Sequence, residues 1–111
     1  MPPIPQVTVE EVAQRQKQGT LPIVLDVRNP DELAIASLPF TTNIPMPQIT
    51  HRIAELEAHK QDEIIVMCHH GGRSQRVAEF LSAQGFTGVK NLVGGIHHWS
   101  LKIDPTVPEY Q

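Results

Sequence analysis

The sequence predicts an α/β fold with a mainly parallel central sheet flanked by helices on both faces. Two short runs, residues 22–27 and 63–67, are apolar, rich in β-branched side chains and without polar alternation. Strands of this kind are typically buried on both faces of a parallel sheet. A third strand is expected at 89–93, and segments with helical spacing separate the strands, an alternation typical of the α/β class.

The elements can be justified in chain order. Residues 1–5 contain three prolines and are expected to form a loose arm, followed by a short edge strand at 6–7. Thr8 and Glu11 fit a capping box, which predicts a helix that ends at Gly19. After the strand at 22–27, a second helix is expected at 29–36, with an N-cap asparagine, a proline and acidic residues in its first turn.

The second half repeats the alternation and completes one domain. Its expected elements are, in order, a strand at 43–45, a helix at 48–60, a strand at 63–67, a helix at 74–84, a strand at 89–93 and a short segment at 96–100 opened by Gly94 and Gly95. We expect a single domain over residues 1–111, with its core at about 6–101 and a loose C-terminal tail that wraps the surface.

Composition excludes several function classes. The chain of 111 residues is 40% hydrophobic and 19% charged, with a net charge of -3, so neither nucleic acid nor an anionic membrane is an expected partner. No apolar run approaches the roughly 20 residues that a membrane crossing needs. The first ten residues lack the features of a secretory signal, and one cysteine cannot form an internal disulfide. We therefore expect a cytoplasmic location.

That one cysteine, Cys68, lies where the second buried strand ends and a helix begins, in the stretch CHHGGRS. Ligands bind beyond the carboxyl ends of the strands in sheets of this class. Gly71 and Gly72 permit the positive φ values that let amides converge, the helix start adds partial positive charge, and Arg73 adds a full one. All three features favour the thiolate over the thiol. The alternative is a buried structural cysteine that ends a strand before a glycine turn.

Four motifs, in this order, resemble the rhodanese family: LDVRNPDEL, NIPM, CHHGGRS and NLVGGIHHWS. The resemblance covers residues 7–101 and implies a sulfurtransferase. Cys68 would take sulfane sulfur from thiosulfate or a protein persulfide, hold it as a persulfide and pass it to a nucleophilic small molecule or protein. It implies no cofactor. The loop amides that would bind the sulfur belong to His69, His70, Gly71, Gly72, Arg73 and Ser74, and the Arg73 side chain would attract an anionic donor and brace the loop.

Two other functions compete with this interpretation. Related cysteine phosphatases and arsenate reductases place five residues between cysteine and arginine, whereas this chain has four, which the resemblance links to the narrower sulfur-binding loop. Rhodanese modules used only for protein binding usually lack the cysteine, which is present here. We therefore expect an enzyme.

Supporting roles are expected for residues outside the Cys68 stretch. Asp26 and Arg28, which rhodanese domains also carry, should form a structural ion pair. Trp99 should fill the core under the loop, and Gly94 and Gly95 should allow the chain to approach the loop closely.

The histidines are expected at the surface. His69 and His70 should point outward as the rim of the site, while His97 and His98 should lie on a solvated helix face. We expect no metal site, because Cys68 and the histidines lack the usual paired ligand spacing.

One segment departs from the family pattern. Many members have G-H-I-P-G-A before the N-I-P element, whereas this chain has ASLPFTTNIP, with Ser37 and Phe40 at the usual histidine and glycine positions. In the family this segment lies near the entrance to the site, so the departure bears on the choice of donor or partner.

Overall fold

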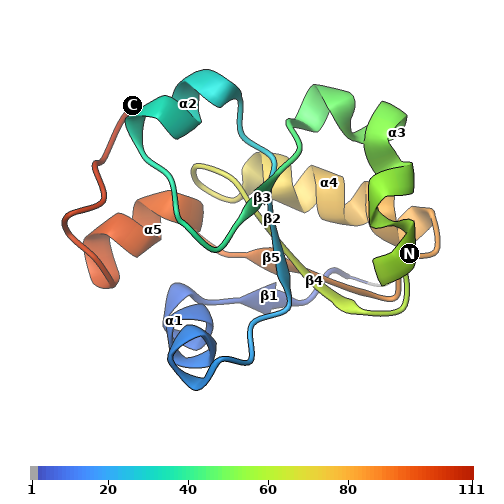
Figure 1. The fold of residues 1–111 in the computed structure, drawn as a ribbon, viewed down its shortest axis with the longest axis horizontal. Helices are drawn as coiled ribbons and strands as arrows, with labels where there is room; N and C mark the ends of the chain where they lie inside the picture. Colours follow the sequence, from blue (N-terminus) through green and yellow to red (C-terminus); the bar gives the residue numbers. More distant parts are fainter. Residues whose placement is uncertain (1–2) are drawn as a thin grey trace.

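The computed structural model describes residues 3–111, which form a parallel five-stranded sheet covered by helices (Figure 1). The strand order is β1-β5-β4-β2-β3, and all four strand pairs are parallel, which confirms the predicted fold class. The strands are β1 (Gln6–Val7), β2 (Ile23–Asp26), β3 (Thr42–Asn43), β4 (Glu63–Met67) and β5 (Gly88–Leu92).

Helices cover both faces of the sheet because successive residues of each buried strand point to opposite sides. The helices are α1 (Val9–Gln18), α2 (Pro30–Ile35), α3 (Ile49–Arg52), α4 (Gly72–Ala83) and α5 (Gly95–Lys102), with 3₁₀ segments η1 (Met46–Gln48) and η2 (Ile53–His59). One apolar cluster joins Ile64 and Val66 of β4 to α3, η2 and α4. The other joins Ile65 and Met67 to α1 and α5, so β4 is buried on both faces.

Three predicted helix signals are confirmed. Thr8 accepts a hydrogen bond from the Glu11 amide at 3.1 Å, while the Glu11 carboxylate accepts one from the Thr8 amide at 3.2 Å. Gly19 ends the same helix in the left-handed conformation, with φ of 69°. At the start of α2, the amide of the N-cap Asn29 donates to the Glu32 carboxylate at 3.0 Å.

The predicted helix at 48–60 was wrong as a single element. The chain instead forms η1, one turn of α3 and the longer η2. The apolar side chains that suggested the helix, Ile49, Ile53 and Leu56, still pack on or in the core. Their spacing suits 3₁₀ and α turns alike, so burial holds the segment in place without requiring one regular helix.

Both expected loose ends pack against the domain where the structure describes them. Residues 1–2 of the predicted arm lie outside the described residues, but Ile4 is 8% exposed and belongs to the core. In the tail, Val107 and Tyr110 pack against the second apolar cluster. The tail is therefore not loose.

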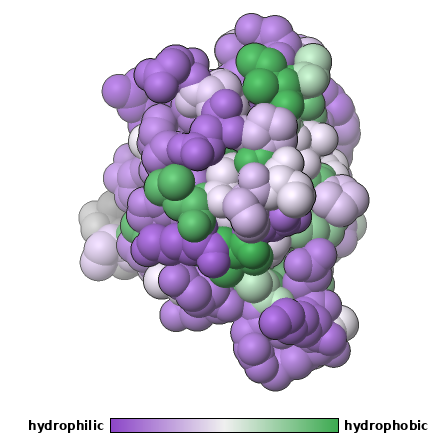
Figure 2. Space-filling view, turned by 90° about the vertical axis from the view of Figure 1, so that its left-hand side faces the viewer, coloured by the Kyte–Doolittle hydropathy of each residue, from purple (hydrophilic) through white to green (hydrophobic). Residues whose placement is uncertain are grey.

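The face over α5 and the tail is mostly hydrophilic, with small separate hydrophobic areas (Figure 2). Within residues 3–111, no helix has both the length and the apolarity needed to cross a membrane.

Candidate active site

The carboxyl ends of the three longest strands bring the candidate residues to one edge of the sheet. Cys68 directly follows β4, the central strand. The register pairs Asp26 at the end of β2 with Met67, and Asn91 of β5 with Val66. Because parallel strands end at the same edge, residues far apart in the sequence meet around the sulfur.

Two main-chain amides donate to the sulfur of Cys68, a residue that is only 1% exposed. Its Sγ accepts hydrogen bonds from the amides of Gly71 at 3.1 Å and Ser74 at 3.4 Å, and Ser74 Oγ lies 3.4 Å away. These amides are available because α4 begins at Gly72, so its first turn has no earlier helical carbonyls to bind. Amide donors in this position are of the kind that can stabilise an anion.

One glycine of the loop has the backbone conformation that was expected of two. Gly71 has φ of 115°, and a Cβ there would lie 3.4 Å from the Gly94 amide nitrogen. Gly72 is the first residue of α4 and does not have a positive φ, so the expectation was wrong for that residue. The turn that directs the amides toward sulfur therefore depends on Gly71.

The first turn of α5 orients the loop from the other side. The Ile96 amide donates to the Cys68 carbonyl and the His97 amide to the His69 carbonyl, both at 3.0 Å. A Cβ on Gly95 would overlap the Cys68 carbonyl oxygen and lie 2.6 Å from that of His69. This close approach requires glycine at position 95. Because the α5 amides bind the Cys68 and His69 carbonyls on the side away from the sulfur, the loop amides are left facing the sulfur.

A polar network beneath the loop was not foreseen from the sequence. Ser74 Oγ lies 2.5 Å from Asn91 Oδ1, and Asn91 Nδ2 donates to Gln6 Oε1 at 2.9 Å. Asn91 also donates to the Gly71 carbonyl at 3.3 Å. The sequence contained one indication of this network. Asn91 is a polar residue inside the strand expected at 89–93, and it is 3% exposed in the structure.

Arg73 makes a contact that sequence reasoning missed. Its guanidinium forms a bidentate ion pair with Glu32 of α2, with both N···O distances at 2.7 Å. The hydrogen bonds from Arg73 lower the pKa of Glu32 to about 2, outweighing the effect of burial, and the Asn29 amide also contributes. Arg73 therefore joins the loop to α2 with its charge largely paired, rather than presenting a free cation.

Tyr110 links that ion pair to a second, fully buried one. The Asp26–Arg28 pair forms as expected, with Nη2 and Oδ2 2.7 Å apart and both side chains fully buried. Arg28 Nη1 donates to the Tyr110 hydroxyl, which donates to Glu32, both at 3.0 Å. Burial acts to lower the pKa of Arg28, but hydrogen bonds to Asp26 and Tyr110 prevail and raise it. The tail thus connects both ion pairs near the loop.

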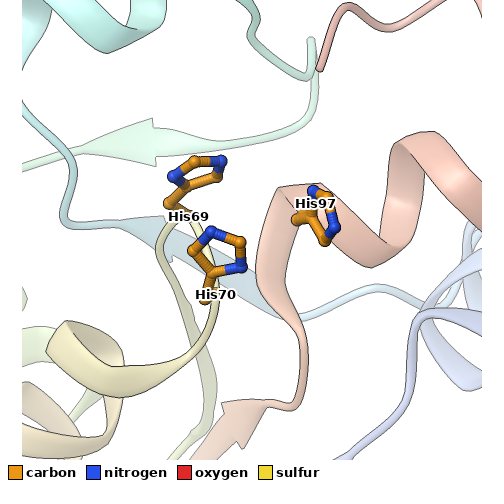
Figure 3. Close-up of side chains that lie close together, drawn as sticks. All are labelled: His69, His70 and His97. Carbon is orange, nitrogen blue, oxygen red and sulfur yellow. The ribbon is translucent and has the colours of Figure 1, made fainter. Parts of the chain in front are cut away.

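The histidines are arranged differently from the prediction (Figure 3). His69 is 8% exposed, and its ring stacks on Tyr110 with centroids 3.8 Å apart, so the expected outward position was wrong. Burial, followed by the charge of His70, lowers the pKa of His69. His70 is exposed, as expected of a rim residue, and its ring centroid lies 4.8 Å from that of His97. Nitrogen atoms of these three rings all lie within 4.8 Å of one another.

Trp99 is buried, but not beside the sulfur. It is 4% exposed and contacts Phe40, with ring centroids 5.4 Å apart. Trp99 belongs to the apolar cluster of α1 and α5 and Phe40 packs against that cluster, whereas Cys68 belongs to the cluster on the other face. Phe40, one of the two departures from the family pattern, thus packs on the Trp99 side.

The comparison with protein-family models decides the classification. The model of the rhodanese-like domain matches residues 8–102. The chain belongs to the rhodanese-like domain family. Its site geometry can therefore be compared with relatives whose names refer to sulfur transfer.

The chain is similar to curated rhodanese-like proteins over nearly all its length. It is 36% identical to the Rhodanese-like/PpiC domain-containing protein 12, chloroplastic, of Arabidopsis thaliana, covering 97% of this chain and 38% of that protein. It is 30% identical to the Adenylyltransferase and sulfurtransferase MOCS3-1 of Zea mays, covering 99% and 25%. The chain thus spans between a quarter and two fifths of these relatives.

Solved structures of rhodanese-like proteins share the fold. A rhodanese-like domain protein from Staphylococcus aureus superposes with a TM-score of 0.81 at 26% identity, covering 97% of this chain and 100% of that one. The fold and the family are therefore established together.

Proposed function

We propose that this rhodanese-like domain is a sulfurtransferase that carries sulfane sulfur as a persulfide on Cys68. The observation that carries the proposal is the pair of amide hydrogen bonds from Gly71 and Ser74 to Sγ. Amides already aimed at a sulfur atom can stabilise an anion there without reorganisation. The sulfurtransferase in the name of the Zea mays relative supports the same chemistry.

The reaction has two steps and returns the enzyme to its starting state. The Cys68 thiolate attacks the outer sulfur of thiosulfate, a new S–S bond forms, and the old one breaks as sulfite leaves with its electron pair. A nucleophile such as cyanide then attacks the terminal sulfur and leaves as thiocyanate, which restores the thiolate. Neither step takes a proton from a hydroxyl group, so we assign no general base.

The shape and charge of the loop bear on which donors it accepts. Because Cys68 is 1% exposed, a donor must present a small, protruding sulfur, as thiosulfate or a persulfide on a protein does. The positive charge of Arg73 is paired with Glu32, so anion binding rests mainly on the amides and the exposed rim around His70 and Gly72. The thiolate must be free to start a new cycle, and a reducing compartment such as the cytoplasm fits that requirement.

The direct test is the intact mass of the protein after incubation with thiosulfate. We expect a gain of one sulfur atom that cyanide removes and that Cys68→Ser does not show. Arg76→Gln, a change at an exposed residue of α4 outside the loop, is the matched control and should load like the wild type. If a folded wild-type protein gains no sulfur from thiosulfate or from a protein persulfide, the proposal is wrong and the domain is a binding module.

A further inference from the structure

Three imidazole rings, two from the loop after β4 and one from α5, lie close together (Figure 3). His69 and His70 follow β4, while His97 lies in the first turn of α5. Each ring offers a nitrogen atom, and these atoms all lie within 4.8 Å of one another. No role in the proposed sulfur transfer requires three histidines at this place.

The backbone, rather than the rings, sets this arrangement. The His97 amide donates to the His69 carbonyl at 3.0 Å, which fixes the first turn of α5 against the loop. Gly95 permits the approach, because a Cβ would lie 2.6 Å from the same carbonyl oxygen. The ring of Tyr110 stacks on that of His69 with an interplanar angle of 6°, and this contact restricts rotation of the His69 ring. The positions of two rings are therefore built into the fold.

Two ring nitrogens in the cluster lack a partner. Within residues 3–111, His69 Nε2 and His97 Nδ1 are the buried side-chain nitrogen or oxygen atoms that make no hydrogen bond. His69 as a whole is 92% buried, being 8% exposed. An unsatisfied buried polar atom costs about 1–3 kcal/mol. Two such atoms, on two of the three clustered rings, therefore point to a bound partner.

We propose that His69, His70 and His97 bind one divalent transition-metal cation of the Zn²⁺ class through three imidazole nitrogens. Neutral imidazole is a preferred ligand of such cations, and three histidines with an open fourth position form a known type of zinc site. Bonds of about 2.1 Å in tetrahedral geometry bring ligand nitrogens to about 3.4 Å from one another. His70 is exposed, so rotation of its ring can close the remaining distance.

The surrounding charges do not oppose a cation. Arg73, the arginine of the adjoining loop, is held in a bidentate pair by Glu32, with both N···O distances at 2.7 Å. Cys68 is not required as a ligand, because its sulfur already receives the Gly71 and Ser74 amides. The proposed metal site thus adjoins the sulfur site without sharing its nucleophile.

The test is a titration of the full, untagged chain with Zn²⁺ against a chromophoric chelator, repeated with Co²⁺ to read the coordination geometry from its visible absorption. We expect one ion per chain and a tetrahedral Co²⁺ spectrum. Loss of a ligand should weaken binding at least about 100-fold in His97→Ala and in His70→Ala, since even a supporting residue contributes about 10–100-fold. His70 is exposed, so its variant should fold.

Control variants separate this site from other sources of binding. His51→Ala removes an exposed histidine of α3 and should bind Zn²⁺ as the wild type does, as should Cys68→Ser. Wild-type binding no tighter than that of His97→Ala would overturn the proposal and leave water as the partner of the two nitrogens. Loss of binding in Cys68→Ser would also overturn it, because the thiolate would then be the ligand.

Discussion

The ion pair between Glu32 and Arg73 offers a quantitative test of how the loop is held. Glu32→Gln keeps the size of the side chain and removes its charge. The pKa of Glu32 falls from 4.5 to about 2, mainly because of the hydrogen bonds from Arg73. Because a tenfold change in an acid dissociation constant corresponds to about 1.36 kcal/mol, this lowering of the pKa corresponds to about 3 kcal/mol. Arg73 is 30% exposed, so solvent screens part of this, and we expect a loss of about 1–3 kcal/mol in the free energy of unfolding.

The pH dependence of this loss is its distinguishing feature. A carboxyl group with a lowered folded-state pKa stabilises the protein above its unfolded pKa, and that contribution disappears as pH falls toward the folded value. The difference between wild type and Glu32→Gln should therefore be full above about pH 4.5 and shrink steadily toward about pH 2. Protonated glutamate and glutamine are both neutral, so the two proteins should converge in acid.

The assay is urea unfolding followed by the fluorescence of Trp99, the one tryptophan of the chain and 4% exposed, from about pH 7 to about pH 3. Glu55→Gln is the matched control, because Glu55 also pairs with an arginine at 2.8 Å but its side chain is 53% exposed. It should change stability little at any pH. A Glu32→Gln loss equal to that of the control, or one that stays constant in acid, would refute the reasoning.

Three further substitutions test other contacts of the site. Asp26→Ala leaves Arg28 charged and fully buried without its partner, so the free energy of unfolding in urea should fall by about 3–5 kcal/mol, whereas a loss below about 1 kcal/mol would contradict a buried pair. Gly95→Ala adds a Cβ that overlaps the Cys68 carbonyl, at a residue whose φ is 56°. We expect it to lower the free energy of unfolding by more than about 1 kcal/mol and to slow alkylation of the Cys68 thiol. An unchanged alkylation rate would show that the loop does not depend on the close approach of α5. Tyr110→Phe keeps the ring but removes the hydroxyl that joins the two ion pairs, and we expect thermal unfolding to show a loss of about 1 kcal/mol, against none if the tail is not anchored.

Local signals in the sequence were sufficient for much of the fold. The buried runs around β2 and β4, the Thr8 capping box and the left-handed Gly19 each depend on a few neighbouring residues, and all appear in the structure. The single helix predicted at 48–60 was wrong because the apolar spacing of this segment does not distinguish α from 3₁₀ turns. Only packing against α4 and the sheet decides between them.

Within the site, too, the Cys68 stretch predicts the contacts between neighbouring residues but not those between distant ones. Its position at a strand end and the turn at Gly71 follow from residues adjacent in the chain, and both are found. The pairing of Arg73 with Glu32 could not be read from the stretch, because the two residues are 41 positions apart. Which acid reaches a given arginine depends on how α2 and α4 are placed across the sheet edge.

The order of strands and helices along the chain, the parallel sheet and a cysteine at the end of a buried strand follow from local patterns, and the sequence was enough to predict them. The stacking of Tyr110 on His69 and the meeting of His69 with His97 were decided by tertiary structure alone. These contacts join segments with no shared sequence pattern, because the pairing of β5 beside β4 is what places α5 and the tail next to the loop. Charge pairing and ring contacts across that edge depend on distances in space, which the linear sequence does not contain.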